Sequence, residues 1–372
     1  MLRCLNGEYA LENSHLNPTV LWQTACRKPR QFFSSLLSAK ISRLSSGVAI
    51  ETKTMAIYSP QAFWKLANDL FKVKEERTFR ALFGTSADVC SILWDYCAVH
   101  KRRPKRGMKP KHLLWALHFL KSYGTEDVLA QWADTTRKTW RKWVWIVLRI
   151  VRKYKNQVVS VFGVTSNNTT FLGHYCLPFI ANMMLSFLAY STQIKWGKRF
   201  SNGGDQYRYC MVSVDGTDFE IQEPYPFSPG WYSHKFKGPG LRYEVALAIS
   251  TGDIVHINGP FPCGNYPDIT IFRKKLKTML RHGEMVEADN GYRGEYYHVR
   301  TPADYHTEEE RREKAVVMAR QETANRRFKQ FGALKQVFRH DINVHRVVFE
   351  AVVVITQLNI NNGEKLFKVS YS

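Results

Sequence analysis

The sequence predicts an α/β fold in which an all-α region precedes a sheet with interleaved helices. Apolar residues recur at helical spacing from about residue 59 to 154, whereas short apolar runs alternate with helical patterns from about residue 205 onward. With 372 residues, 44% of them hydrophobic, the chain is long enough for about two domains with a substantial core. We therefore expect a helical domain at 56–156 and an α/β domain at 201–372.

The segments outside these two domains show no sustained periodicity. Residues 1–55 are predicted to be a disordered leader, and residues 157–200 a linker with an apolar insertion. Within this linker, residues 171–190 approach the length of a membrane span, but His174 and Pro178 interrupt the apolar run. We therefore favour a buried or inserted segment over a transmembrane helix and expect no membrane partner.

The formal net charge of +22 points to a polyanionic partner. Aromatic residues are interleaved with the basic segments, which favours nucleic acid over a membrane surface, while a merely soluble basic protein stays the plain alternative. The basic run at 101–106 suits a nuclear localisation signal, a phosphate-binding loop or a solvated loop. The seven cysteines form no Cys-x-x-Cys pair, which argues against a zinc ribbon and favours a reducing compartment.

The helical domain contains a pattern typical of a helix-turn-helix unit. Residues 111–120 carry apolar side chains at helical spacing, Thr125 can cap a short helix over 126–133, and Thr135 or Thr136 can cap a third helix. In such a unit the last helix enters the major groove of DNA, although three-helix units also occur as plain scaffolding. The candidate DNA contacts on the third helix are Arg137, Lys138, Arg141 and Lys142. The tryptophans of this helix are expected to pack the three helices together: Trp140, Trp143 and Trp145.

In the α/β domain the order of elements is strand, hairpin, helix, strand and long helix. The strand is expected at 209–214, the hairpin at 243–258, a helix at 269–282 and a short strand at 284–288. A capping box at 307–310 opens the long helix, which is predicted to end near residue 331. This is the chain order of a ribonuclease-H-like core, which we take as the expected fold of the catalytic domain.

Three acidic residues stand where a metal site could form. Asp215 and Asp289 each follow an apolar run and are expected at strand ends, whereas Glu322 projects from the long helix. Carboxylates from three separate elements suit two hard divalent cations, Mg²⁺ or Mn²⁺, which can clamp the two oxygens of a phosphodiester exchange. Asp218 is the nearest rival of Asp215, but strand alternation places it on the opposite face. Asp268 is expected to be a turn or helix-capping residue.

At these motifs the sequence resembles the DDE superfamily endonucleases, specifically the PIF/Harbinger-like transposase family. The matching segments fall in the family's order and span roughly 205–360: Val214–Thr217, Trp231–Phe236, Gly264–Asp268, Asp289–Tyr292 and Arg320–Asn325. The resemblance implies a DNA endonuclease with Asp215, Asp289 and Glu322 as its catalytic and metal-binding triad. It also implies double-stranded DNA as substrate, a homo-oligomer, a nuclear location and a separate Myb-like DNA-binding partner.

Further basic residues are candidates for DNA contact near this triad. Arg326 and Lys329 follow Glu322 at helical spacing and share one face with it, and Lys235 stands in a matching segment. Two other functions stay open at this stage. One is a domesticated, non-catalytic transposase-derived DNA-binding protein, and the other is a nuclease of the same fold that acts on RNA.

Overall fold

The computed structural model of the protein describes residues 2–5, 8–11, 58–99, 107–155, 210, 212–226, 228–249, 251–280 and 283–369. The chain divides into two compact units, residues 1–56 and residues 57–372. In the first unit, β1 (Leu2–Leu5) and β2 (Glu8–Leu11) form an antiparallel pair. The basic run at 101–106 and the predicted linker at 157–200 lie outside the described residues, as does most of the predicted leader.

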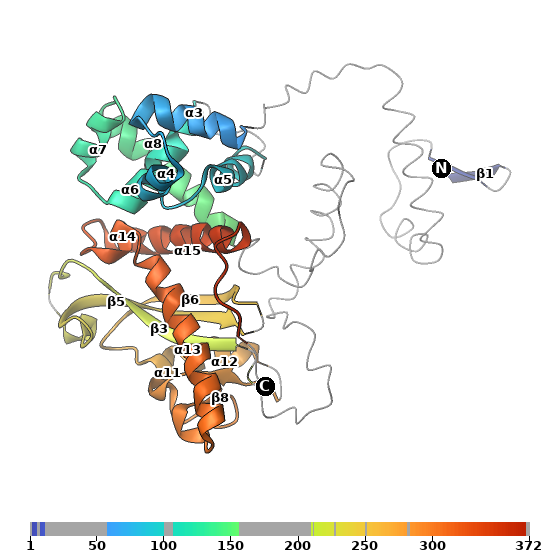
Figure 1. The fold of residues 1–372 in the computed structure, drawn as a ribbon, viewed down its shortest axis with the longest axis vertical. Helices are drawn as coiled ribbons and strands as arrows, with labels where there is room; N and C mark the ends of the chain where they lie inside the picture. Colours follow the sequence, from blue (N-terminus) through green and yellow to red (C-terminus); the bar gives the residue numbers. More distant parts are fainter. Residues whose placement is uncertain are drawn as a thin grey trace. The chain divides into compact units, whose positions relative to one another are not determined.

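Among the described residues of the second unit, six α-helices precede the sheet (Figure 1), in the expected helical region. They are α3 (Pro60–Phe71), α4 (Glu76–Phe83), α5 (Ala87–Val99), α6 (Pro110–Ser122), α7 (Glu126–Trp132) and α8 (Arg137–Val151), the last followed by the 3₁₀ turn η1 (Arg152–Tyr154). Their ends follow local chemistry. The Ser59 hydroxyl accepts a hydrogen bond from the Ala62 amide at 3.2 Å at the start of α3, and Gly84 ends α4 in the left-handed region with φ 72°.

The predicted three-helix pattern is confirmed in α6, α7 and α8. Thr136, rather than Thr135, caps α8, because its hydroxyl accepts the Thr139 amide at 3.3 Å. Trp140 and Trp143 are buried, and Trp145 packs against the same hydrophobic core. The tryptophans therefore pack the helices together, as expected from the sequence.

The α/β part contains a mixed sheet of six strands among the described residues: β3 (Val212–Glu220), β4 (Tyr232–Ser233), β5 (Gly238–Ala248), β6 (Ile254–Pro262), β7 (Val286–Glu287) and β8 (Val299–Arg300). The strand order is β6-β5-β3-β7-β8, and the short β4 also pairs with β5. β5 pairs antiparallel with both β3 and β6, whereas β3, β7 and β8 are parallel neighbours. This order is consistent with the expected ribonuclease-H-like core.

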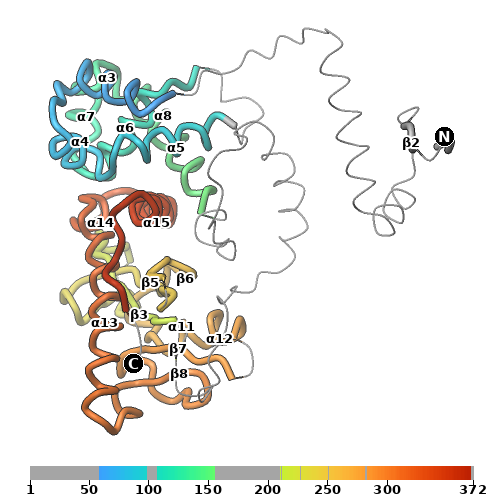
Figure 2. The backbone as a smooth tube through the Cα atoms, turned by 45° about the vertical axis from the view of Figure 1, so that its right-hand side comes forward, coloured from blue at the N-terminus to red at the C-terminus, as the bar shows by residue number. Residues whose placement is uncertain are grey.

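Five α-helices of the described residues complete this part of the fold, two of them between β6 and β7 and three after β8 (Figures 1 and 2). They are α11 (Asp268–Lys274), α12 (Leu276–Met279), α13 (Glu308–Phe328), α14 (Gly332–Lys335) and α15 (His345–Asn361). The capping box is confirmed: Thr307 and Glu310 bond each other's backbone amides at the start of α13. Every residue of α15 from His345 to Ile360 except Arg346 is buried, as expected for a helix that is apolar on nearly all sides. One hydrophobic core joins α15 to the helical region and to β3, β5 and β6.

Two sequence expectations differ from the structure in their boundaries. The first strand does not end at Asp215, because Thr217 and Phe219 continue to pair with β5 opposite Tyr243 and Leu241. The helix expected at 269–282 is interrupted at Lys275, whose backbone leaves the helical region at φ −143°.

The short 3₁₀ turns of the α/β part are η2 (Pro229–Trp231), η3 (Asn290–Tyr292), η4 (Pro302–Asp304) and η5 (Ile342–Val344). Among the helices of the described residues, none has the length and apolar character needed to cross a membrane.

Candidate nuclease site

Asp215 lies in the middle of β3 and is partly buried. Its carboxylate oxygen Oδ2 accepts a hydrogen bond of 2.8 Å from the amide nitrogen Nδ2 of Asn325 on α13. One turn earlier, Gln321 accepts the Ser213 hydroxyl at 2.7 Å and donates to the Val245 carbonyl at 3.0 Å. Two amide side chains therefore fix α13 against the sheet, and one of them holds Asp215.

Asp289 lies close enough to Asp215 for the charge of one carboxylate to act on the other. β3 and β7 pair Val212 with Val286 and Ser213 with Glu287, and the same step of 74 residues separates Asp215 from Asp289, beyond the last pair of this ladder. Asp289 follows the end of β7 and caps η3, where its Oδ1 accepts the Gly291 amide at 2.8 Å. It is exposed, so its other oxygen is open to a ligand.

Asp268 is a third carboxylate at this place, and the sequence did not predict it there. A Cβ atom added to Gly216 would lie 1.8 Å from Asp268 Oδ1, and one added to Gly291 would lie 3.2 Å from Asp268 Oδ2. Its side chain makes no capping hydrogen bond at α11, so the capping expectation is wrong. A glycine inside a strand often marks a close approach, and the Asp215-Gly216 pair was therefore the available signal.

Asp215 and Asp268 share an environment that opposes their charge. Burial, followed by the charges of Asp289 and Asp268, raises the pKa of Asp215 to about 7, while the Lys235 charge acts in the opposite direction. Burial also raises the pKa of Asp268, against the lowering effect of Arg242. Asp268 Oδ1 is buried and has no hydrogen-bond partner. Desolvated, mutually repelling carboxylates are stabilised by a bound cation.

Glu322 is exposed on α13, between the two residues that bind the sheet. It precedes Asn325 by three residues, so the two side chains are neighbours on one helix face. Among the described residues, no three His, Cys, Asp or Glu side chains are assembled as a group that could hold a metal ion. The structure therefore brings Asp215 and Asp289 together but does not assemble Glu322 with them.

Asp218, the sequence rival of Asp215, is committed to a buried ion pair. Its two oxygens accept Arg242 Nε at 2.7 Å and Arg242 Nη2 at 2.9 Å, and the Ser233 hydroxyl donates to it at 2.7 Å. These hydrogen bonds oppose the effect of burial and hold the pKa of Asp218 below its usual value. Asp218 thus has a structural role on its face of β3.

The basic side chains expected near the triad fall in two places. Lys235 reaches the site, where its ammonium donates to the Gly216 carbonyl at 2.9 Å. Glu322 and Arg326 are exposed on α13, and Lys329, the C-cap of this helix, is also exposed. The predicted common face is therefore solvent-accessible.

The four candidate DNA contacts on α8 are all exposed, but they differ in their partners. Arg137 pairs with Asp127 at 3.2 Å, and Arg141 Nε donates to Glu126 at 2.6 Å. The ammonium of Lys142 lies 5.0 Å from the ring centre of Trp143, and Lys138 is exposed. Acids in the first turn of α7 therefore pair with two of the four candidate contacts.

The oxygen donors at this site fit a hard divalent cation. Asp215, Asp289 and Asp268 offer carboxylate oxygens, one of them buried and unpartnered. The four described free cysteines are buried.

No protein-family model matches the chain, and no curated protein matches it. Among solved structures, the chain is similar to a crystal structure of a pre-cleavage Mos1 transpososome, with 10% sequence identity and a TM-score of 0.17. It is also similar to a crystal structure of the Mos1 mariner paired end complex with Mn, with 12% identity and a TM-score of 0.16. Each similarity covers 83% of this chain and 94% of the other. TM-scores this low carry no conclusion about fold or function.

Proposed function

We propose that this protein is a metal-dependent DNA endonuclease of the DDE type, a transposase-like phosphoryl transferase with a ribonuclease-H-like core. The observation that carries the proposal is the proximity of Asp215, inside β3, to Asp289, just beyond the end of the parallel strand β7. The helix α13, which bears Glu322, bonds to Asp215 through Asn325. The net charge of +22 and the exposed basic residues of α8 support a nucleic-acid substrate.

In this proposal Asp215, Asp289 and Glu322 hold two Mg²⁺ or Mn²⁺ ions. Bound divalent ions would lower the pKa of an attacking water or 3′-hydroxyl and neutralise charge on the leaving oxygen. Asn325 fixes the orientation of Asp215 through its 2.8 Å hydrogen bond. Lys235, bonded to the Gly216 carbonyl, is placed to balance the negative charge of a bound phosphate.

A plasmid-nicking assay with Mg²⁺ or Mn²⁺ tests the proposal. We expect nicking by the wild-type protein, loss of nicking for Asp289→Ala, and similar DNA affinity for both proteins. Asp304→Ala is a matched control, because Asp304 lies outside the proposed triad. Its carboxylate accepts a hydrogen bond from the Thr301 amide at the start of η4. Full nicking by Asp289→Ala would refute the assignment.

The alternative is a domesticated, non-catalytic transposase-derived DNA-binding protein. The observation that favours it is the exposed position of Glu322, which is not assembled with the two aspartates. DNA binding without metal-dependent nicking, in wild type and Asp289→Ala alike, would support this function. Homo-oligomerisation, a Myb-like partner and a nuclear location belong to the proposal as expectations of the family resemblance.

A further inference from the structure

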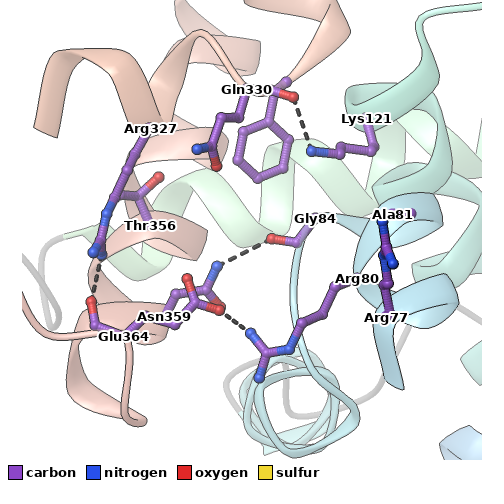
Figure 3. A pocket seen from close by; sticks show the side chains of 11 residues that line it. Arg77, Arg80, Ala81, Gly84, Lys121, Arg327, Gln330, Thr356, Asn359 and Glu364 are labelled. Atoms are coloured by element: carbon purple, nitrogen blue, oxygen red, sulfur yellow. Dashed lines mark hydrogen bonds and ion pairs between the residues drawn. The ribbon is translucent and has the colours of Figure 1, made fainter. Parts of the chain in front are cut away.

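A basic site lies in a cavity of about 310 Å³ between α4, α6, α13 and α15. It shares no lining residue with the proposed triad of Asp215, Asp289 and Glu322. Four cationic side chains line it against one carboxylate: Arg77, Arg80, Lys121 and Arg327 against Glu364. In Figure 3, Arg327 and Thr356 lie on one side of the cavity, and Arg77, Arg80 and Lys121 lie on the other. Cations from three different helices therefore surround one space.

The cations of this cavity are only partly neutralised within the protein. Arg80 pairs with Glu76 at 2.7 Å and also with Glu364. Lys121 donates to the Gln330 carbonyl at 2.9 Å, and Arg327 donates to the carbonyl oxygens of Glu364 and Lys365. Because a carbonyl oxygen carries no full charge, Lys121 and Arg327 keep unbalanced charge and an ammonium keeps further donors. Burial lowers the pKa of both groups, as it does for cations that lack a counter-charge.

The wall of the cavity contains a buried hydroxyl group with no partner. Thr356 on α15 is 2% exposed, lines the cavity, and its Oγ1 atom makes no hydrogen bond. The neighbouring wall is fixed, because Asn359 donates to the Gly84 carbonyl at 3.0 Å and accepts the Thr85 hydroxyl at 2.5 Å. A buried polar group without a partner is unfavourable, so a ligand with hydrogen-bonding oxygens would satisfy it.

We propose that this cavity binds a phosphate group, carried either by a free nucleotide or polyphosphate or by the end of a DNA strand. A phosphate presents several acceptor oxygens and about −1.5 to −2 charges at neutral pH, which suits guanidinium and ammonium donors converging from several helices. The cavity volume lies at the lower end of the range for small-molecule sites, about 300–1,000 Å³, and suits a single nucleotide. This phosphate site uses none of the proposed catalytic carboxylates, so the proposal does not depend on the proposed nuclease function.

Calorimetric titration with pyrophosphate and dAMP, without divalent metal and at fixed ionic strength, tests the site. We expect Thr356→Val to weaken binding about tenfold, since a hydrogen bond to a charged group is lost, while the Tm of the free protein stays equal or rises because an unsatisfied hydroxyl is removed. Arg77→Gln changes an exposed residue, so it should fold normally and also weaken binding. Arg149→Gln, an exposed arginine on α8 outside the cavity, is the matched control.

Oligonucleotides with a 5′-phosphate and with a 5′-hydroxyl distinguish the two sources of phosphate. Tighter binding of the 5′-phosphorylated strand that Thr356→Val and Arg77→Gln abolish, with weak dAMP binding, indicates a DNA end. Binding of dAMP or pyrophosphate with the same variant sensitivity indicates a free ligand. The proposal is overturned if every probe binds the two cavity variants and Arg149→Gln as it binds wild type, or if no probe binds better than chloride.

Discussion

Asp215 lies inside β3, and Asp289 lies just beyond the end of β7, the parallel neighbour of β3. The paired residues of the two strands end at Ser213 and Glu287, so both carboxylates lie beyond the last pair of this ladder. Burial raises the pKa of Asp215, and the charges of Asp289 and Asp268 raise it further, because the three acids lie close together.

The first prediction concerns the charge of Asp215. Asp215→Asn should abolish metal-dependent nicking, because an amide is a poorer ligand for a divalent cation than a carboxylate. The same change should leave the metal-free protein as stable as wild type at pH 8 or more stable, since it removes repulsion with Asp289 and Asp268. Nicking assays and urea unfolding at pH 8 measure the two effects. A marked loss of stability with retained nicking would contradict the assignment.

The second prediction concerns Asn325, which sequence reasoning did not single out by itself. Asn325→Ala should reduce nicking roughly tenfold or more, since the lost hydrogen bond leaves Asp215 Oδ2 unpaired and free to turn. Asn325→Asp should reduce nicking further in the absence of excess metal, because it adds a third negative charge next to Asp215. Thr323→Ala is the control, as its hydroxyl bonds only within α13 to the Ala319 carbonyl at 2.8 Å. Equal metal dependence in all three variants would exclude a positioning role.

The third prediction separates Asp218 from Asp215. Asp218→Ala should destabilise the fold by about 3–5 kcal/mol, because it leaves the Arg242 guanidinium without its bidentate partner in a mostly buried place. Urea unfolding at pH 7 measures the loss. A change below about 1 kcal/mol would show that the Asp218–Arg242 pair is not a structural element. Asp304→Ala, which removes a half-buried capping carboxylate from the turn η4 and leaves no buried charge unpaired, is expected to cost far less.

The sequence predicted those parts of the fold that local chemistry determines. The capping box at Thr307 correctly located the start of α13. The hairpin of β5 and β6 was likewise predicted at 243–258, within the bounds of the two paired strands. In each case the signal lies within a few residues of the element that it defines.

Long-range pairing could not be predicted in the same way. The length of β3 depends on its partner β5, so an apolar run that stops at Val214 does not show that the strand continues to Glu220. The approach of Asp268 to Gly216 depends on how α11 packs near the sheet, which no local pattern records. The bond from Asn325 to Asp215 spans 110 residues and has the same origin.

The fourth prediction concerns DNA binding by α8. Replacing Lys138 and Lys142 with glutamine should weaken binding to duplex DNA more than replacing Arg137 and Arg141, because the arginines are already paired with acids of α7. The logarithm of the binding constant falls as the logarithm of the salt concentration rises, and each lost phosphate contact should make this slope shallower by about one. Fluorescence anisotropy between 50 and 200 mM salt measures this. Equal effects of the two double substitutions would show that the ion pairs open at no cost.

The last prediction concerns stability at acid pH. Burial lowers the pKa of His345 to about 3, and its Nδ1 lies 2.8 Å from the Tyr243 hydroxyl oxygen. An unfolded histidine binds a proton below about pH 6.5, whereas the folded one stays neutral to about pH 3. The unfolded chain therefore binds more protons in this window, and the stability present above pH 6.5 is lost as the pH falls toward 3. Burial acts in the same direction on His112 and His118, whose pKa values are about 4.

His345→Gln removes the side chain that takes up this proton in the unfolded chain, while the glutamine amide keeps a polar partner for Tyr243. The slope of unfolding free energy against pH between 6 and 4.5 should then fall by up to about 1.4 kcal/mol per pH unit. Urea unfolding at several pH values measures the slope, and His234→Gln, at an exposed position, is the control. If His345→Gln and His234→Gln lose stability with acid as steeply as wild type, then His345 is protonated in the folded protein. The loss of stability in acid would then arise from other groups. A protonated His345 would also need a counter-charge in the core, since the Tyr243 hydroxyl beside its Nδ1 carries none.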